Sequence, residues 1–370
     1  MKRLVSCLLL ALSGITPLTA VDHSVAGREY PANAPQVRYV GRTLADAGGS
    51  VSFDWTGTYL EARFTGDAFD IRVSDTGTSY YNVLLDGEPQ DVATVCGRDT
   101  LINLVSGAGG GTHTLRLQKR SEGEFGRTTL HRILLAPDGE LLPAPAKKAR
   151  HIEFMGNSLT CGYGVEGKHA DEPFEVRTEN CDLAFACVTA RYFDADYTLI
   201  AHSGRGTARN YGDSLSTSAC TMKDKMMNTF DESPTVLWDF AKGYRPDLVV
   251  INLGSNDFST KPHPLKEEFV KSYLQILRQL RQSYGKDMPI LCLYPVGIQD
   301  SVYDYYEAVV SEAGDPHVHL LKLSPELYNR STDMGAAWHP GISGQRKMAM
   351  CIIPHIATLM GWELEPKPVK

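Results

Sequence analysis

The chain has 370 residues, 42% of them hydrophobic, which is enough for two domains with sizeable cores. Its formal net charge of −7 argues against nucleic acid or an anionic membrane surface as the main partner. The sequence contains neither a low-complexity tract nor a short-period repeat.

The first twenty residues are predicted to be a signal peptide. Residues 2–3 are basic, residues 8–12 are apolar, and residues 18–20 fit a cleavage site. Residues 4–7 resemble a lipoprotein motif, but the apolar stretch follows the cysteine instead of preceding it, which argues against lipidation. Since no other segment is long and apolar enough to span a bilayer, we expect an exported protein, periplasmic or extracellular, without a membrane span.

Removal of this leader, which holds Cys7, leaves seven of the eight cysteines. An odd number implies at least one free thiol in an oxidising compartment. Cys292 and Cys351 lie in apolar surroundings and are expected to be buried. The sequence leaves open the pairing of Cys96, Cys161, Cys181, Cys187 and Cys220. Because no spacing of cysteines and histidines indicates a metal site, we expect no metal and no cofactor.

From about Val37 to Leu142, short β-rich runs alternate with turns, which predicts a β-sandwich of the jelly-roll type. The predicted strands are residues 51–55, 60–64, 69–73, 80–85 and 112–117. Asp-Gly pairs at 86–87 and 138–139 indicate turns. A stiff polar linker follows at 142–148, and the domain boundary is predicted near residue 147.

The predicted organisation is thus a signal peptide (1–20), a β-sandwich domain with linker (21–147) and a second domain (148–370). In the second domain strands alternate with helices through short connections, which predicts a parallel sheet covered on both faces. We expect five strands in the flavodoxin-like order 2-1-3-4-5. The predicted strands are 152–155, 198–202, 248–253, 289–294 and 317–322. The predicted helices are 181–193, 235–242, 264–284, 301–312 and 343–360.

Two of these helices allow more detailed predictions. In the last helix, Ser343 is expected to be the N-cap and Gly361 to follow the end. The helix at 264–284 carries an apolar stripe that we expect to face the core. The stripe consists of Leu265, Phe269, Tyr273, Ile276 and Leu280.

Polar residues stand where ligand sites form in open α/β sheets. Ser158 follows the strand at 152–155, Asn256 follows the strand at 248–253, and His339 precedes the last helix. The carboxyl ends of parallel strands meet at one edge of a sheet, where such proteins bind their ligands. A serine hydroxyl is an effective nucleophile only beside a base and an oxyanion site, and this pattern supplies candidates for both.

Four blocks carry a family resemblance: Gly156-Asn157-Ser158, residues 202–206 (HSGRG), residues 254–257 (GSND), and residues 338–340 (WHP). In this order they resemble the blocks of the SGNH hydrolases. The β-rich first half and the stretch 238–254 narrow the resemblance to carbohydrate esterase family two, which joins a jelly-roll domain to an SGNH domain. The resemblance implies a three-layer α/β/α catalytic domain, and removal of acetyl groups from plant polysaccharides such as xylan or glucomannan.

The chemistry of an ester hydrolase assigns a role to each residue. Ser158 is expected to attack the carbonyl, and His339 to accept the serine proton and pass it to the leaving alkoxide. The expected oxyanion donors are the backbone N–H groups of Ser158 and Gly204 and the side-chain amide of Asn256. Glycine at 204 lets the backbone approach the reacting carbonyl without a Cβ between them.

The sequence departs from the resembled family at the triad acid. Relatives commonly carry an aspartate two or three residues before the histidine, where this chain has Ala337 and Ala336. Either a main-chain carbonyl between Ala336 and Trp338 orients His339 in a Ser-His dyad, or Asp333 loops back to it. We favour the carbonyl and expect Asp333 to be a solvated loop residue. Asp257 is expected to cap its own loop.

The substrate is less clearly encoded. Tyr211, Trp338 and Trp238 are candidates for an aromatic face against a sugar ring, and the resemblance implies an acetylated polysaccharide or oligosaccharide as partner. One alternative is an SGNH esterase acting on lipid, thioester or sialic acid esters, although no amphipathic insertion that could form a lipase lid lies between the blocks. Another is a non-catalytic carbohydrate-binding protein, which the missing acid keeps open.

Overall fold

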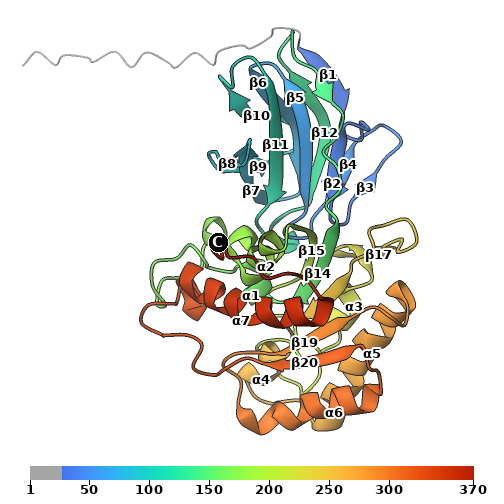
Figure 1. Ribbon diagram of the computed structural model, residues 1–370, viewed down its shortest axis with the longest axis vertical. Helices are drawn as coiled ribbons and strands as arrows, with labels where there is room; N and C mark the ends of the chain where they lie inside the picture. Colours follow the sequence, from blue (N-terminus) through green and yellow to red (C-terminus); the bar gives the residue numbers. More distant parts are fainter. Residues whose placement is uncertain (1–26) are drawn as a thin grey trace, which may run out of the picture.

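A computed structural model describes residues 27–370 of the chain, so the predicted signal peptide lies outside the described residues. A β-sandwich domain and an α/β domain stack along the long axis of the molecule (Figure 1). Within residues 27–370, none of the helices has the length and hydropathy needed to cross a membrane.

The β-sandwich consists of two antiparallel sheets. One has the strand order β10-β6-β12-β4-β3, with β1 on β12, and the other the order β13-β5-β11-β7-β8, with β2 on β5 and β9 on β7. The strands are β1 (Arg28–Pro31), β2 (Val37–Val40), β3 (Leu44–Ala45), β4 (Val51–Phe53), β5 (Tyr59–Thr65), β6 (Ala68–Asp75), β7 (Thr78–Leu85), β8 (Glu88–Pro89), β9 (Ala93–Cys96), β10 (Thr100–Ser106), β11 (Thr112–Lys119), β12 (Thr128–Leu135) and β13 (Leu141–Leu142). A 3₁₀ turn, η1 (Gly123–Phe125), lies between β11 and β12.

Alternating burial explains the sandwich. Along β6, Phe69, Ile71 and Val73 are buried, while the residues between them are more exposed. Leu60 and Phe64 of β5 enter the same core from the other sheet. Period-two alternation is the signature of a strand with one face against a core, and each of the five predicted strands is observed. The predicted β-sandwich is therefore confirmed.

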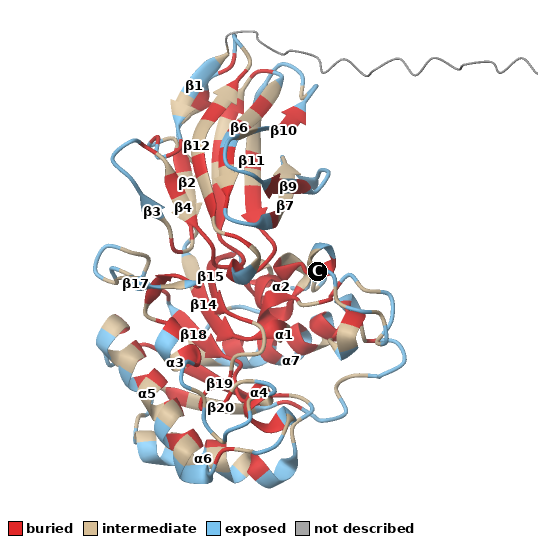
Figure 2. Cartoon of the chain, turned by 180° about the vertical axis from the view of Figure 1, so that it is seen from behind, coloured by how far each residue is buried: buried red, intermediate tan, exposed pale blue. Residues whose placement is uncertain are grey.

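The α/β domain contains a five-stranded parallel sheet in the order β15-β14-β18-β19-β20, which is the predicted order 2-1-3-4-5. Its strands are β14 (Arg150–Gly156), β15 (Ala195–Ala201), β18 (Leu248–Ile251), β19 (Ile290–Tyr294) and β20 (Val318–Lys322). The first three are buried along nearly their whole length (Figure 2). A hairpin, β16 (Asn228–Phe230) and β17 (Ser233–Leu237), forms a separate two-stranded sheet.

Helices cover both faces of the parallel sheet, so the predicted three-layer architecture is confirmed. The α2 and α7 residues pack on one face, and the α3, α5 and α6 residues on the other. The helices are α1 (Ser158–Cys161), α2 (Phe185–Tyr192), α3 (Met222–Lys225), α4 (Ser255–Ser259), α5 (Lys266–Tyr284), α6 (Tyr303–Ala313) and α7 (Ile342–Met360). Short 3₁₀ turns are η2 (Val176–Thr178), η3 (Cys181–Leu183), η4 (Asp300–Val302) and η5 (Ala336–Trp338).

The helix predicted at 235–242 is wrong. Residues 233–237 form β17, which pairs with β16 and contains the strand-forming sequence Thr-Val-Leu. The Asp239 side chain then accepts the N–H groups of Ala241 and Lys242, a local turn that competes with helix formation.

Three single-residue predictions are also wrong. Gly341, not Ser343, is the N-cap of α7, because the Ser343 hydroxyl is bound to Asp333. Leu265 is the N-cap of α5 and is 67% exposed, whereas the other four stripe residues are buried. Cys351 is exposed on α7, although Cys292 is buried in β19 as predicted. All seven cysteines within residues 27–370 are free thiols in the structure.

The two domains share a tightly bonded interface. Asp196 of β15 accepts hydrogen bonds from Arg38 at 2.7 Å and from Tyr59 at 2.8 Å, both in the β-sandwich. Asp54 of the β-sandwich accepts the N–H of Asp231 at 2.7 Å. Because these contacts are buried or partly buried, the β-sandwich is a structural support of the α/β domain and not a loosely tethered module.

Candidate active site

Ser158 lies at the carboxyl end of β14, on the first turn of the short helix α1. The strand ends at Gly156, where a Cβ would lie only 2.0 Å from Thr160 Oγ1, so the turn requires glycine. Asn157 caps α1 by accepting the Leu159 N–H, and its own amide donates to Ser255 Oγ at 2.9 Å. Ser158 is thereby placed on a rigid strand-to-helix turn.

His339 lies against Ser158 from the loop before α7. Its Nε2 is 2.9 Å from Ser158 Oγ, and its Nδ1 is 2.8 Å from the backbone oxygen of Ala337. A carbonyl oxygen can only accept, so Nδ1 carries the proton and Nε2 is left as the acceptor for the serine hydroxyl. This tautomer is the one a general base needs.

An unusual backbone conformation brings the carbonyl of Ala337 to the His339 ring. Ala337 (φ 51°) and Trp338 (φ 59°) both adopt left-handed conformations, each of which costs about 1–3 kcal/mol for a residue other than glycine. The N–H groups of these two residues donate to the carbonyls of Glu172 and Ala170, which holds the segment in place. The predicted contact between a carbonyl of residues 336–338 and His339 is therefore present.

Asp333 does not contact His339. Its carboxylate accepts the Asn329 N–H at 2.7 Å, the Ser343 hydroxyl at 2.8 Å and the Lys347 ammonium group at 2.5 Å. These bonds occupy Asp333 at the start of α7. The expectation of a solvated loop residue is wrong, since the side chain is buried under α7.

Gly204 and Asn256 lie on neighbouring loops at the same edge of the sheet. Gly204 follows β15 with φ +74°, a conformation that favours glycine. Asn256 stands on α4, and its side-chain amide donates to the Arg205 carbonyl at 2.8 Å. That bond joins α4 to the loop that contains Gly204. It therefore holds the Asn256 amide and the Gly204 N–H near each other.

Asp257 organises a neighbouring loop instead of its own. Its two carboxylate oxygens accept the N–H groups of Thr207, Ala208 and Arg209 at 2.7–2.9 Å. Burial raises the pKa of Asp257 to about 6, and these three N–H groups counteract that rise. The prediction that Asp257 caps its own loop is wrong, because the loop after β15 packs directly onto α4.

The environment of His339 favours its neutral form. Burial lowers the pKa of His339, while the Ala337 carbonyl and the negative charge of Glu122 act in the opposite direction. The net effect is a pKa below the ordinary histidine value. The ring is therefore ready to accept a proton at neutral pH.

A cavity of about 310 Å³ opens beside His339. It is lined by Leu159, Val296, Gly297, Pro325, Tyr328, Arg330, Met334, Trp338, His339 and Pro340. Trp338 is 58% exposed at this cavity, and Tyr211, 62% exposed, donates its N–H to the Gly204 carbonyl. Two of the three predicted aromatic residues thus lie beside the predicted catalytic groups.

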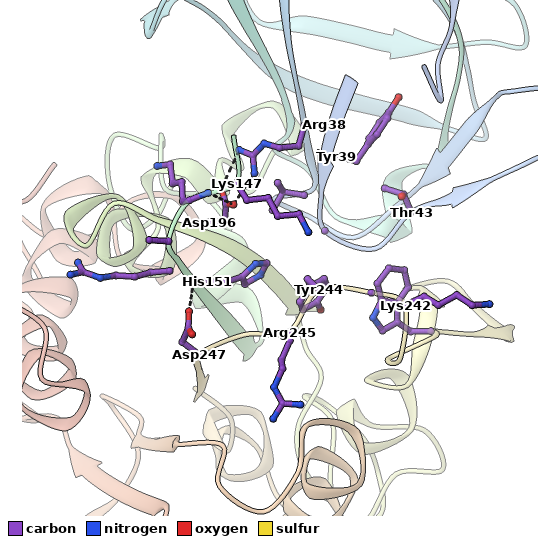
Figure 3. Close-up of a pocket in the computed structure, with 17 residues that line it drawn as sticks. Arg38, Tyr39, Thr43, Lys147, His151, Asp196, Lys242, Tyr244, Arg245 and Asp247 are labelled. Carbon is purple, nitrogen blue, oxygen red and sulfur yellow. Dashed lines mark hydrogen bonds and ion pairs between the residues drawn. The ribbon is translucent and has the colours of Figure 1, made fainter. Parts of the chain in front are cut away.

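Trp238 lies elsewhere. It lines a second cavity of about 410 Å³ between the domains, with His151 at the start of β14 and Asp247 just before β18 (Figure 3). This is the amino edge of the parallel sheet, opposite to the edge that carries Ser158. The prediction that Trp238 contacts substrate near Ser158 is therefore wrong; its ring packs beside Tyr244 instead.

Sequence reasoning missed two contributions to the site. Tyr163 lies with its ring 4.6 Å from the His339 ring and stacks on Phe174. Glu122, from the β-sandwich domain, binds the backbone of Ser203, next to Gly204. Tyr163 stands five residues after Ser158 and could have been considered, but no sequence signal connects Glu122 to this edge.

One group of side chains has the composition of a metal site: His202, Asp231 and Glu232, whose ligand atoms lie within 4.8 Å of one another. The Lys225 ammonium group lies 3.0 Å from Asp231 and 2.7 Å from Glu232. His202 Nδ1 binds Asp231 at 2.7 Å. The cluster is therefore an ion-pair network in which a lysine neutralises the carboxylates.

Comparison with protein families divides the chain as the structure does. The carbohydrate esterase 2 N-terminal family matches residues 39–145. The GDSL-like lipase/acylhydrolase family matches residues 152–352, which is more than half of the chain.

Individual relatives agree with these matches. The Cellulase/esterase CelE of Acetivibrio thermocellus is 33% identical over 337 residues, covering 89% of this chain but only 40% of the longer relative. An acetylxylan esterase / glucomannan deacetylase of Cellvibrio japonicus is 26% identical over 325 residues, covering 84% of this chain and 87% of the relative. A structure of a family two carbohydrate esterase from Clostridium thermocellum in complex with cellohexaose is 30% identical, with a TM-score of 0.79 over 88% of this chain and 100% of that chain.

Proposed function

We propose that this chain, a member of carbohydrate esterase family two, is a serine esterase. Its proposed reaction is the removal of O-acetyl groups from plant polysaccharides such as xylan and glucomannan. The observation that supports this most strongly is the alignment of Ser158, His339 and the Ala337 carbonyl by two hydrogen bonds. Relatives described as acetylxylan esterase and glucomannan deacetylase support the substrate class.

In the proposed acylation step, the Ser158 oxygen forms a bond to the ester carbonyl carbon while its proton moves to His339 Nε2. The carbonyl electron pair moves onto oxygen, where the N–H groups of Ser158 and Gly204 and the Asn256 amide stabilise it. Collapse of this intermediate breaks the bond to the sugar oxygen, which receives the proton from His339. The products are a free sugar hydroxyl and acetyl-Ser158.

Deacylation repeats these steps with water as the nucleophile. His339 accepts a proton from water, the hydroxyl adds to the acetyl carbon, and the same donors stabilise the oxyanion. Acetic acid leaves as the proton returns from His339 to Ser158, and it then ionises in water to acetate. Throughout both steps, the Ala337 carbonyl accepts a hydrogen bond from His339 Nδ1–H. A Ser-His dyad therefore carries out the acyl transfer without a carboxylate bound to the ring.

We place the sugar in the cavity beside His339, which Trp338 lines; Tyr211, bonded to the Gly204 carbonyl, is a second candidate for contact with the sugar. An exposed aromatic face can stack on a sugar ring, and the cavity volume of about 310 Å³ is at the lower end of the usual range for small-molecule sites. A polymeric substrate also agrees with the proposed export of the protein.

Hydrolysis of a chromogenic acetate ester tests the serine mechanism. The wild type is expected to be active, and Ser158→Ala to fall to near background with the fold intact, since loss of a nucleophile costs several orders of magnitude. Thermal unfolding of both proteins is the control for folding. More than about a tenth of the activity left in S158A would contradict the assignment of Ser158 as the nucleophile. A folded wild type without activity would favour the non-catalytic binding protein instead.

A second candidate is an esterase for other short acyl esters. It is favoured by the apolar residues Leu159, Val296 and Met334 in the cavity beside His339. A series of chromogenic esters of increasing acyl length separates the two: we expect kcat/KM to be highest for acetate and to fall as the chain grows. A maximum at a longer acyl group would favour the second candidate.

A further inference from the structure

Glu122 comes from the β-sandwich domain but is bound to the catalytic edge of the α/β domain. It immediately precedes η1 and is completely buried. Its carboxylate accepts the Ser203 N–H at 2.5 Å with one oxygen and the Ser203 hydroxyl with the other. Two charge-assisted hydrogen bonds to one residue fix that residue in place.

The residue held in this way adjoins a proposed oxyanion donor. Ser203 is followed by Gly204, which has a φ of +74°. The direction of the Gly204 N–H depends on the backbone of Ser203. Loss of the Glu122 contact would let this donor turn away, and small errors in donor position are costly in catalysis.

Glu122 also acts on His339 through its charge. The negative charge of Glu122 favours the protonated ring, against the effect of burial. In a serine triad, an aspartate both orients the histidine and stabilises its charged form. Here the Ala337 carbonyl accounts for orientation, but a carbonyl dipole provides less stabilisation than a full charge.

Several other titratable groups surround Glu122. Burial and the adjacent Glu122 carboxylate raise the pKa of Glu179 well above its usual value, so Glu179 is held neutral. Burial likewise keeps the Cys161 thiol protonated. The titratable or charged groups facing Glu122 are Lys119, Glu124, Cys161, Tyr163, Glu179, His202 and His339.

We propose that Glu122 is a positioning residue that the β-sandwich domain supplies to the catalytic site, an inference that rests on the proposed function. Its carboxylate fixes the Ser203–Gly204 turn, and its negative charge favours the protonated form of His339. The β-sandwich is then part of the catalytic apparatus and not only a buttress.

Glu122→Gln tests both parts of this proposal in the full chain. We expect kcat for the chromogenic acetate to fall about 10–100-fold with little change in KM. The acid limb of the pH profile of kcat/KM should move to lower pH, because removal of a negative charge destabilises the His339 imidazolium. A merely structural role would lower activity without moving this limb.

Two further variants separate position from charge. Ser203→Ala keeps the Glu122 charge and the backbone bond, so kcat should fall less and the acid limb should stay at the wild-type pH. Glu124→Gln removes a carboxylate on the same turn that does not bind Ser203, and it should behave as wild type. A kcat of S203A equal to that of the wild type would overturn the proposed role of Glu122 in fixing the Ser203–Gly204 turn. This test holds even where E122Q does not fold. An unmoved acid limb in a folded E122Q would overturn the role of its charge.

An NMR titration of His339 makes this test independent of turnover. The imidazole resonance, assigned by its absence in His339→Gln, should titrate at lower pH in E122Q than in wild type and at an unchanged pH in E124Q. If the wild type hydrolyses no acetate ester, the proposed function fails, but this titration still decides the electrostatic inference. An equal pKa in wild type and E122Q would overturn it.

Discussion

The two edges of the parallel sheet both carry cavities, but the side chains around these cavities have different partners. At the amino edge, Arg38 is bound to Asp196, Lys148 to Asp194 and Lys242 to Asp239. At the carboxyl edge, a chain of hydrogen bonds runs from Ala337 through His339 to the hydroxyl of Ser158. At the first edge these three cations are paired with carboxylates, whereas the second presents the proposed nucleophile and base.

This difference shows that cavity size does not identify the functional edge. The amino-edge cavity is larger, about 410 Å³ against about 310 Å³, yet its Arg38–Asp196 ion pair joins the two domains. Asp196, for example, ties β15 to Arg38 and Tyr59 of the β-sandwich. The carboxyl edge is distinguished by convergence of groups with complementary roles in acyl transfer.

His339→Ala should show the largest effect of the variants that test this contrast. Without the base, the Ser158 hydroxyl has no acceptor for its proton, so we expect kcat to fall by about 10⁴–10⁶-fold. Steady-state kinetics on a chromogenic acetate measure it, with circular dichroism as the folding control. A loss below tenfold would mean that another group serves as the base.

Asn256→Ala should have the next largest effect. If its amide stabilises the oxyanion, kcat should fall by about 10²–10³-fold with a small change in KM. The bond to the Arg205 carbonyl is lost in the same variant, so Asn256→Asp serves as a size-matched comparison that lacks the donor. A change confined to KM would identify Asn256 as a substrate-binding or structural residue instead.

Asp333→Asn should affect stability more than catalysis. Its carboxylate binds Lys347 and Ser343 but not His339, so kcat/KM should fall less than about tenfold, whereas loss of a true triad acid costs about 10⁴. Weakening these buried bonds should lower the free energy of unfolding by about 1–3 kcal/mol in denaturant titrations. A D333N variant that is stable but has lost most of its kcat/KM would show that the dyad account is wrong.

Trp238→Ala should have the smallest effect on catalysis. The residue lies at the amino edge, so kcat/KM on both the chromogenic ester and an acetylated oligosaccharide should equal the wild-type values. Trp338→Ala is the matched aromatic control at the other edge and should raise KM for the oligosaccharide. A higher KM in W238A would restore Trp238 as a substrate-binding residue and remove the contrast between the edges.

Much of the fold could be predicted because its signals are local. Apolar strands alternating with helices predicted the sheet order, and period-two alternation predicted the β-sandwich. The errors arose where neighbours in space override local preference. Ser343 would make a good N-cap, but its hydroxyl is taken by Asp333, and residues 233–237 pair with β16 instead of forming a helix.

The site residues could be predicted where their positions follow from the order of strands and helices along the chain. Ser158, Gly204, Asn256 and His339 lie at strand ends or before a helix, so topology brings them to one edge. The pair of alanines at 336 and 337 pointed to a carbonyl partner for His339. Glu122 could not be found in this way, because its contact with Ser203 spans 81 residues and two domains. Trp238 was misplaced because a tryptophan in the sequence gives no information about whether it lies at the amino or the carboxyl edge of the sheet.

Acetate release from acetylated xylan and acetylated glucomannan, by wild type and S158A under identical conditions, tests the central claim most directly. We expect the wild type to release acetate from at least one of these polymers and S158A to release none above the rate without enzyme. Acetate release by S158A at the wild-type rate, or a wild type that cleaves chromogenic esters but leaves every acetylated polysaccharide intact, would contradict the account.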